Sequence, residues 1–371
     1  MNLLLILAAG LAQAQGLDST FNLHNHTYCS DGSDTPEAFV EVAQKAGVKV
    51  VAVTDHDTVA CIERAVAAGK KAGVSVVPGI EISAEDDSMH ILGLGIDVSN
   101  PKLVGLMTKN RQARLDRARQ TVEQLNKLTA HGKPIKITLK DILVQKLNAV
   151  RKTEGKPAVD PNATEEQLLA EAGPITRPDI ALTMVAKGYV RDTREAFDSY
   201  LGDEGGAAAE LDGPAFKDAI GSIHAAGGIA VLAHPHTIYK YKEKPYHYSG
   251  KTYRDFDAVL EDLLVAGLDG VEQYKAGHGP AEFIVAHAKA FGAKAGKTVL
   301  LTPGSDYHGA SGVGQSHFDA IGVPPDMAKL IKDALRKSSG GGGPAPRQSA
   351  LTGGETSRVQ AVLSGAGLEI P

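Results

Sequence analysis

Short apolar runs that end in polar residues alternate with helical stretches along this chain. Residues 48–53 and 74–77 are rich in valine and read as strands, whereas residues 36–45 and 62–72 have the pattern of amphipathic helices. Strands that alternate with helices favour βα units and a parallel sheet or barrel. In such folds the chemistry gathers where the strands end, so the polar residues after each run are the candidate functional residues.

The alternation stops after Pro101 and returns more than a hundred residues later. The intervening sequence has apolar residues at helical spacing. We therefore predict one α/β domain formed by residues 21–100 and 222–337, with a helical insertion at 101–221. The strands expected after the insertion are residues 228–233, 268–272 and 298–301.

The two ends of the chain have a different composition. Residues 3–9 form an apolar run, and Ala12-Gln13-Ala14 follows it like a signal-peptidase site, although no Lys or Arg precedes the run. Residues 1–20 are thus expected to be a signal peptide or a disordered extension, and the run is too short to span a bilayer. The first alternative implies a periplasmic or secreted protein without a membrane span in its mature form; the second implies a cytoplasmic one. Residues 338–371 begin with a Gly-rich stretch and are expected to be a linker and tail.

Charge is distributed unevenly along the sequence. The formal net charge is −5, but residues 101–160 contain 14 Lys and Arg against 5 Asp and Glu. This basic segment fits either the recruitment of an anionic substrate or a solvated helical face. The chain contains no Trp, which argues against an aromatic platform for stacking bases.

The cysteine content excludes two kinds of architecture. Cys29 and Cys61 are the two cysteines of the chain, which is too few for a disulfide scaffold. Neither belongs to a Cys-x-x-Cys pair of the kind found in structural zinc sites.

A His-x-His pair at the end of the first expected strand gives the clearest chemical signal. Side chains alternate along an extended strand, so His24 and His26 project from the same face. With Asp31 on the following turn, they can close on one divalent cation. An isolated pair of this kind is more often a coincidence, but similar residues follow the other strands.

Nine histidines and carboxylates have comparable positions, most of them directly after an apolar run. Imidazole and carboxylate ligands without thiolate suit Mn²⁺, Fe²⁺ or Zn²⁺. Nine ligands exceed the needs of one ion, so two or three ions fit the number better. The predicted metal ligands are His24, His26, Asp31, His56, Glu81, His90, His234, Asp306 and His308.

The ordered motifs around these residues resemble those of the PHP (polymerase and histidinol phosphatase) superfamily over roughly residues 21–337. The motifs are His24-x-His26 with Ser30-Asp31-Gly32, Thr54-Asp55-His56-Asp57, Gly79-Ile80-Glu81, Ala233-His234-Pro235 and Gly304-Ser305-Asp306-x-His308. The resemblance implies an α/β fold with a distorted (β/α)7 barrel and a trinuclear metal site. It also implies a metal-bound hydroxide as the attacking group, with no separate catalytic side chain.

Residues 175–202 resemble the helical insertion of one branch of this superfamily, which includes nucleoside 3′,5′-bisphosphate phosphatases and 5′→3′ exoribonucleases. The resemblance implies that Arg177 and His278 contact the substrate phosphate. That branch usually continues Ala-His-Pro with Gly-Arg, whereas this chain has His236 next, which we predict as a third substrate contact. Asp179 also stands where the branch commonly has histidine.

Three hypotheses about function follow. The first is a metal-dependent phosphoesterase acting on a small phosphorylated molecule, such as a nucleotide or the end of a short RNA. The second keeps the metals but changes the substrate to another phosphomonoester or to a non-phosphate ester or amide. The third is a metal-binding module without turnover. No obligate protein partner is evident from the sequence.

Overall fold

The computed structural model describes residues 20–85, 87–239, 245–274, 281–296, 298–310, 318, 321–322 and 325–340. The expected signal peptide or extension, His278 and most of the expected tail lie outside these residues. The chain divides into two compact units, the first containing residues up to Arg114 together with Glu210–Ser339. The second contains Leu115–Ala209. None of the described helices is both long and apolar enough to cross a membrane.

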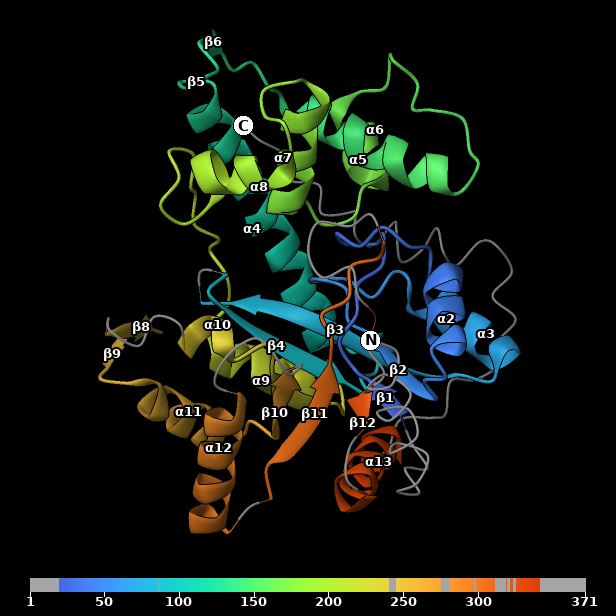
Figure 1. The fold of residues 1–371 in the computed structure, drawn as a ribbon, viewed down its shortest axis with the longest axis vertical. Coiled ribbons are helices and arrows are strands. Elements are labelled where there is room, and N and C mark those ends of the chain that lie inside the picture. The colour runs from blue at the N-terminus through green and yellow to red at the C-terminus, as the bar shows by residue number, and fades with distance from the viewer. Residues whose placement is uncertain are drawn as a thin grey trace, which may run out of the picture. The chain divides into compact units, whose positions relative to one another are not determined.

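One sheet organises the described part of the first unit (Figure 1). Its strand order is β11-β10-β7-β4-β3-β2-β1-β12. The strands are β1 (Thr20–Asn22), β2 (Val50–Val53), β3 (Ser75–Ala84), β4 (Met89–Leu94), β7 (Ile229–Leu232), β10 (Gly270–Tyr274), β11 (Leu300–Gly304) and β12 (Ile321–Gly322).

Strand β1 and the segment after it approach β11 and nearly close the sheet. The Leu23 amide donates to the Pro303 carbonyl over 2.8 Å, and Asn25 forms a parallel bridge with Tyr307. Seven strands therefore enclose an interior, and the expected distorted (β/α)7 barrel is confirmed.

Strand direction explains where the polar residues meet. Strands β1, β2, β3, β7, β10 and β11 pair in parallel where they are neighbours, whereas β4 is antiparallel to both β3 and β7. The beginning of β4 consequently lies at the same edge of the sheet as the carboxyl ends of the other strands. His90, the second residue of β4, reaches the expected cluster for this reason.

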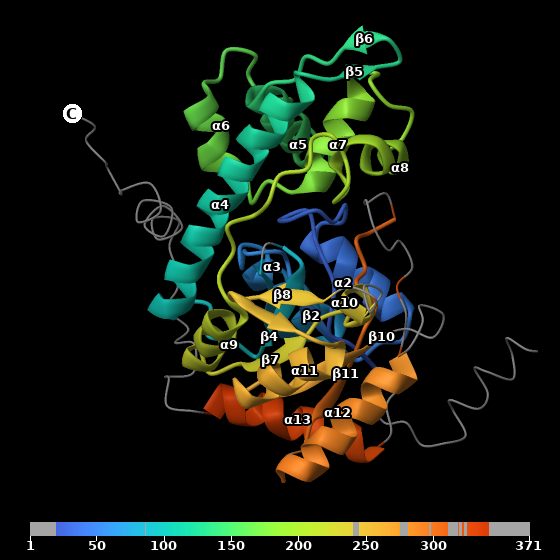
Figure 2. The same cartoon turned by 90° about the vertical axis from the view of Figure 1, so that its left-hand side faces the viewer.

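Helices cover the outside of the sheet, as Figure 2 also shows. Alternation along β2 directs Ala52 into the barrel interior with Phe21 and Leu23, whereas Val51 and Val53 pack among α2 and α3 residues. The helices of this unit are α2 (Pro36–Lys45), α3 (Ile62–Ala72), α9 (Phe216–Ala225), α10 (His236–Tyr239), α11 (Phe256–Val265), α12 (Ala281–Ala295) and α13 (Pro325–Gly340), with a small hairpin of β8 (Tyr246–Tyr248) and β9 (Lys251–Tyr253).

Local sequence sets the helix ends. Thr35 caps α2 by accepting a hydrogen bond from the Ala38 amide, and Pro36 occupies the first turn, where its missing N–H costs nothing. Gly73 ends α3 in the left-handed conformation that glycine adopts readily. Both helices follow the sequence prediction closely.

The second unit is mainly helical and has its own apolar core. Long helix α4 (Pro101–Leu125) begins in the first unit and ends in the second. The remaining elements are β5 (Thr129–Ala130), β6 (Lys133–Pro134), α5 (Leu139–Thr153), α6 (Glu165–Glu171), α7 (Arg177–Ala186), α8 (Thr193–Ala196) and a π-helical turn, η1 (Phe197–Leu201).

Candidate metal centre

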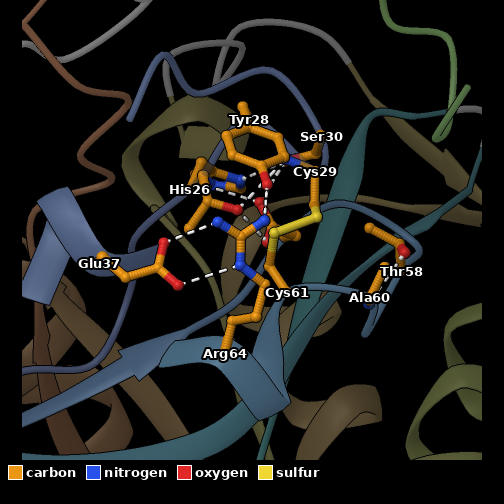
Figure 3. The surroundings of a disulfide bond; sticks show 11 residues. His26, Tyr28, Cys29, Ser30, Glu37, Thr58, Ala60, Cys61 and Arg64 are labelled. Atoms are coloured by element: carbon orange, nitrogen blue, oxygen red, sulfur yellow. Dashed lines mark hydrogen bonds and ion pairs between the residues drawn. A yellow bond between two sulfur atoms is a disulfide. The ribbon is translucent and has the colours of Figure 1, made fainter. Parts of the chain in front are cut away.

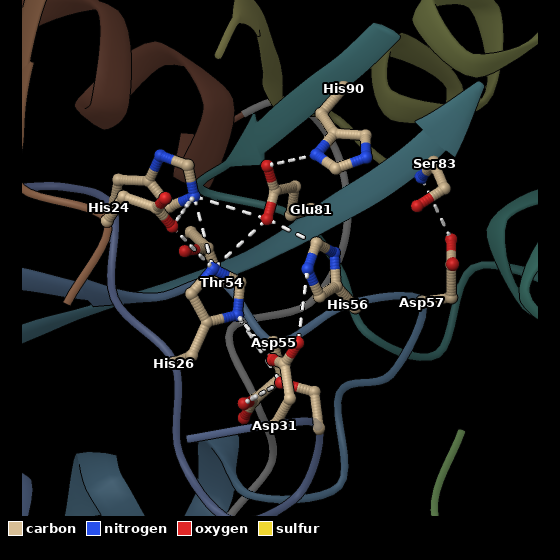
Figure 4. A network of polar contacts seen from close by, with 12 residues as sticks. His24, His26, Asp31, Thr54, Asp55, His56, Asp57, Glu81, Ser83 and His90 are labelled. Atoms are coloured by element: carbon tan, nitrogen blue, oxygen red, sulfur yellow. Dashed lines mark hydrogen bonds and ion pairs between the residues drawn. The ribbon is translucent and has the colours of Figure 1, made fainter. Parts of the chain in front are cut away.

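Glu81, near the middle of β3, lies at the centre of the histidine cluster (Figure 4). Its side chain is fully buried, and its Oε2 atom lies 3.2 Å from His24 Nε2, 3.1 Å from His26 Nε2 and 3.2 Å from His56 Nδ1. Oε2 nevertheless accepts no hydrogen bond. Three imidazole nitrogens therefore converge on a buried carboxylate oxygen without the geometry of proton donors.

The other oxygen of Glu81 faces two further histidines. Oε1 lies 2.9 Å from His90 Nδ1 and 3.0 Å from His234 Nε2. These two nitrogens are 3.2 Å apart. Glu81 thus connects residues from the segments after β1, β2 and β7 and from β4 itself.

Asp306 and His308 extend the cluster from the loop after β11. Asp306 Oδ1 lies 3.2 Å from His26 Nε2 and 3.3 Å from His24 Nε2. His308 stacks on His26 with ring centroids 4.2 Å apart, and its Nε2 lies 3.6 Å from Asp31 Oδ1. All nine residues predicted from the sequence are therefore brought together at one edge of the sheet.

Two of these residues hold unusual backbone conformations. Asp306 has φ of +52° and His234 has φ of +24°. Non-glycine residues rarely adopt positive φ, and such strain concentrates at functional sites.

Hydrogen bonds on the far sides of the rings show which nitrogens face inward as acceptors. His24 Nδ1 lies 3.0 Å from Glu272 Oε1, and His90 Nε2 lies 3.1 Å from Asp87 Oδ1. His308 Nδ1 lies 2.8 Å from the Asp306 carbonyl oxygen. Carboxylates and carbonyls only accept, and a neutral imidazole has one hydrogen. With that hydrogen on the outward nitrogen, the inward nitrogen keeps the lone pair that a metal ion would take.

Hydroxyl groups fix two more rings by the same logic. Ser30 Oγ donates to Asp55, so it accepts from His26 Nδ1 at 3.3 Å. Thr237 Oγ1 donates to the His234 carbonyl, so it accepts from His234 Nδ1 at 3.2 Å. Five rings therefore present lone pairs to the centre, as metal-ligating histidines do.

The carboxylates impose a strong attraction for positive charge. Burial lowers the pKa of His26, but Asp306 and Glu81 outweigh burial and raise it to about 10. Burial raises the pKa of Glu81, but His24, His56 and His90 outweigh it and hold the pKa well below its usual range. At His56 burial dominates and lowers the pKa to about 3. Ionised carboxylates in a buried cluster call for cations, which protons or metal ions can supply.

Distances and donor types fit divalent metal ions. Metal–ligand bonds of about 2.0–2.2 Å place two ligands of one ion roughly 3 Å apart, which is the spacing around Glu81 Oε2. Among the described residues, three groups made up of histidines and carboxylates alone have ligand atoms that all lie within 4.8 Å of one another. The groups are His26-Asp31-His56-His308, His24-His26-Glu81-Asp306 and His56-Glu81-His90.

A disulfide bond joins two of the loops that carry the cluster (Figure 3). Cys29, two residues before Asp31, is bonded to Cys61, which precedes α3. Nearby, Arg64 makes a two-pronged ion pair with Glu37 across α3 and α2. The bond joins residues 32 positions apart in the sequence and was not among the sequence predictions.

Asp57 follows His56 but faces away from the cluster. Its Oδ2 accepts from Arg114 Nε over 2.7 Å, and its Oδ1 accepts from Asn110 Nδ2 over 2.6 Å. Arg114 also donates to Ser83 Oγ over 2.7 Å. This buried network anchors the residue that directly follows His56.

The three substrate contacts predicted from the sequence belong to different parts of the chain. Arg177 begins α7 in the second unit and pairs with Asp203 over 3.0 Å. His236 begins α10, and its ring centroid lies 6.4 Å from that of His234. His278 lies outside the described residues. Asp179 accepts a hydrogen bond from the backbone amide of Thr176, the residue that precedes α7. It also forms a buried ion pair with Lys146 over 2.9 Å.

Sequence reasoning missed the residues that support the ligands. Glu272 ends an apolar run just as Glu81 does, so the pattern that identified Glu81 could have identified it. Asp55 also follows an apolar run closely, and Asp87 lies three residues before His90. Arg114 gave no comparable signal, because its contact with Asp57 joins segments 57 residues apart.

Comparisons with known proteins agree with this geometry. The PHP domain family matches residues 22–172. The chain is 31% identical over 259 residues to a 5′-3′ exoribonuclease of Haemophilus influenzae, covering 69% of this chain and 80% of that protein. It is 26% identical over 311 residues to a 3′,5′-nucleoside bisphosphate phosphatase of Chromobacterium violaceum, covering 83% of this chain and 93% of that protein.

A solved structure supports the same assignment. A protein from Bifidobacterium adolescentis described as a metal-dependent phosphoesterase superposes with a TM-score of 0.63 at 27% identity. The superposition covers 85% of this chain and 96% of that one. The chain therefore belongs to the PHP family and is a metal-dependent phosphoester hydrolase.

Proposed function

We propose that this enzyme binds two or three divalent ions and removes phosphate from a nucleotide or from the end of a short RNA. The observation that carries the proposal is the set of three overlapping ligand groups around Glu81. His26 and His56 each belong to two groups, and Glu81 also belongs to two. Shared ligands would hold neighbouring ions close together, as in multinuclear phosphoesterases. The oxygen and nitrogen donors suit Mn²⁺, Fe²⁺ or Zn²⁺.

The ions, when bound, would supply an activated water and neutralise charge on the phosphate. The protein residues have the separate task of keeping the donors in place. Glu81 is held by β3, Asp306 by a strained turn, and the rings by their outer hydrogen bonds. Such preorganisation limits reorganisation during the reaction.

The names of the relatives support a substrate with a terminal phosphate on a nucleotide. One relative is named as an exoribonuclease and the other as a bisphosphate phosphatase. Arg177 is our proposed phosphate contact, since a guanidinium suits bidentate binding of phosphate. We also propose His236 and His278 as substrate contacts.

One sequence feature favours a second candidate, a different small phosphomonoester. His236 stands where the nucleotide-specific branch usually has Gly-Arg. An imidazole lacks the permanent charge and the two-pronged donor geometry of a guanidinium, which would weaken the grip on a doubly phosphorylated ligand.

The disulfide supports our proposal that the protein works in an oxidising compartment. Disulfides persist in the periplasm and outside the cell and are rare in the cytosol. A bond between Cys29 and Cys61 thus fits the reading of residues 1–14 as an export signal. N-terminal sequencing of the mature protein tests this proposal, and intact residues 1–14 would contradict it.

A substrate panel tests the function. Protein reconstituted with Mn²⁺ is assayed for phosphate release from nucleoside 3′,5′-bisphosphates, 5′-phosphorylated oligoribonucleotides and simple phosphomonoesters. We expect the highest kcat/KM on one of the two nucleotide classes. A preference for simple monoesters would favour the second candidate, and no release from any substrate would refute the proposal.

A further inference from the structure

Glu272 is a buried carboxylate beside the cluster that belongs to none of the three ligand groups. It lies on β10, the strand between β7 and β11. We infer that Glu272 is a positioning residue that sets the tautomer and orientation of His24 and anchors the backbone of His234. The inference rests on the proposed metal site.

Both oxygens of Glu272 are used. His24 Nδ1 lies 3.0 Å from Oε1 and 3.2 Å from Oε2, and the backbone amide of His234 donates to Oε2 over 2.6 Å. Two residues that stack on each other, with ring centroids 5.6 Å apart, are thereby held by one side chain.

This contact determines which nitrogen of His24 can bind a cation. A carboxylate cannot donate, so Nδ1 carries the hydrogen and Nε2 keeps its lone pair. Nε2 is the atom that lies 3.2 Å from Glu81 Oε2 and 3.3 Å from Asp306 Oδ1. In the opposite tautomer an N–H would point at the site of the ion, and binding would require its loss.

A glycine on the neighbouring strand, β11, leaves room for the Glu272 side chain. A Cβ atom at Gly304 would come within 2.0 Å of Glu272 Oε1 and 2.6 Å of His24 Cβ. Gly304 pairs with Tyr274 at the end of β11, two residues before Asp306. Any larger residue at this position would displace the carboxylate from His24.

The same strand offers a matched control at its other end. Asp269, which precedes β10, accepts from His224 Nε2 over 2.8 Å and from the Ala230 amide over 2.8 Å. It therefore makes the same two kinds of hydrogen bond as Glu272, to a histidine ring and to a backbone amide at the β7 strand. His224 belongs to none of the ligand groups.

The test compares Glu272→Gln with Asp269→Asn. In glutamine an amino group replaces one of the two oxygens, so a donor would stand where Glu272 now offers an acceptor to His24 or to the His234 amide. We expect Glu272→Gln to weaken binding of one Mn²⁺ ion about 10- to 100-fold in isothermal titration, because second-shell changes act on that scale. Asp269→Asn should leave every Mn²⁺ affinity within about twofold of the unsubstituted protein. Equal affinities for Glu272→Gln and the unsubstituted protein would overturn the inference.

A measurement on the unsubstituted protein tests the inference without requiring that a variant folds. Nitrogen-15 NMR of the Zn²⁺-loaded protein, labelled in histidine, should show His24 bound through Nε2 with a hydrogen on Nδ1. Binding through Nδ1 would overturn the inference. If the unsubstituted protein takes up neither Mn²⁺ nor Zn²⁺, the proposed metal site itself fails, which separates the two conclusions.

Discussion

Two buried carboxylates, Asp57 in the segment after β2 and Glu81 on the neighbouring β3, have opposite surroundings. Asp57 meets Arg114 and Asn110, which donate to both of its oxygens. Glu81 meets five imidazole nitrogens, and its Oε2 accepts no hydrogen bond. The first carboxylate has hydrogen-bond donors from the chain on both oxygens, whereas Oε2 of the second has none.

The difference distinguishes structural burial from a binding site. A buried ion pair with complete hydrogen bonding holds the backbone but offers nothing to a ligand. Lone pairs that converge with a carboxylate leave a centre of negative potential that a cation completes. Disrupting Asp57 should therefore reduce stability, and disrupting Glu81 should reduce metal binding and turnover.

The largest effect should come from Glu81→Gln. Because Glu81 belongs to two ligand groups, its loss should lower kcat/KM about 1,000-fold or more. Metal content, measured by mass spectrometry on the folded protein, should fall in parallel. Retention of normal metal content with normal turnover would show that Glu81 is not a ligand.

Arg114→Met should act on stability instead. Removing the guanidinium leaves Asp57 charged and buried, which costs about 3–5 kcal/mol in free energy of unfolding. Urea denaturation of the metal-free protein measures this cost. Adding Asp57→Asn should recover part of the lost stability. An Arg114→Met protein as stable as the parent would contradict the structural role assigned to Asp57.

The disulfide should make an intermediate contribution, and it should affect both the free energy of unfolding and metal binding. Replacing both Cys29 and Cys61 by serine should lower the free energy of unfolding by about 2–4 kcal/mol. Cys29 precedes Asp31 closely, so the Mn²⁺ affinity should fall as well. Unchanged stability and unchanged affinity in the double variant would show that the bond has no part in holding the loops.

Ser30→Ala should have the smallest effect of the four. It removes the hydrogen bond that fixes His26 and a donor to Asp55. We expect a loss of Mn²⁺ affinity of about 10-fold, measured by titration calorimetry, with all ligands still present. A loss as large as that of Glu81→Gln would mean that Ser30 does more than orient a ring.

The fold and the clustering of the nine candidate side chains were largely predictable because strand ends carry a local signal. An apolar run followed by histidine or carboxylate marks His24, His56, Glu81 and His234 in the sequence alone. The supporting contacts were not predictable, since Glu272 reaches His24 across 248 residues and Arg114 reaches Asp57 across 57. The reversal of β4, which brings His90 to the cluster, likewise follows from sheet pairing rather than from local sequence.

The most direct test of the central claim is phosphate release before and after removal of metal from the unsubstituted enzyme. Exhaustive dialysis against a chelator should abolish hydrolysis of the best substrate in the panel. Adding Mn²⁺ should restore hydrolysis in the unsubstituted enzyme but not in Glu81→Gln. Full turnover by chelated protein, with metal shown to be absent by mass spectrometry, would contradict the account.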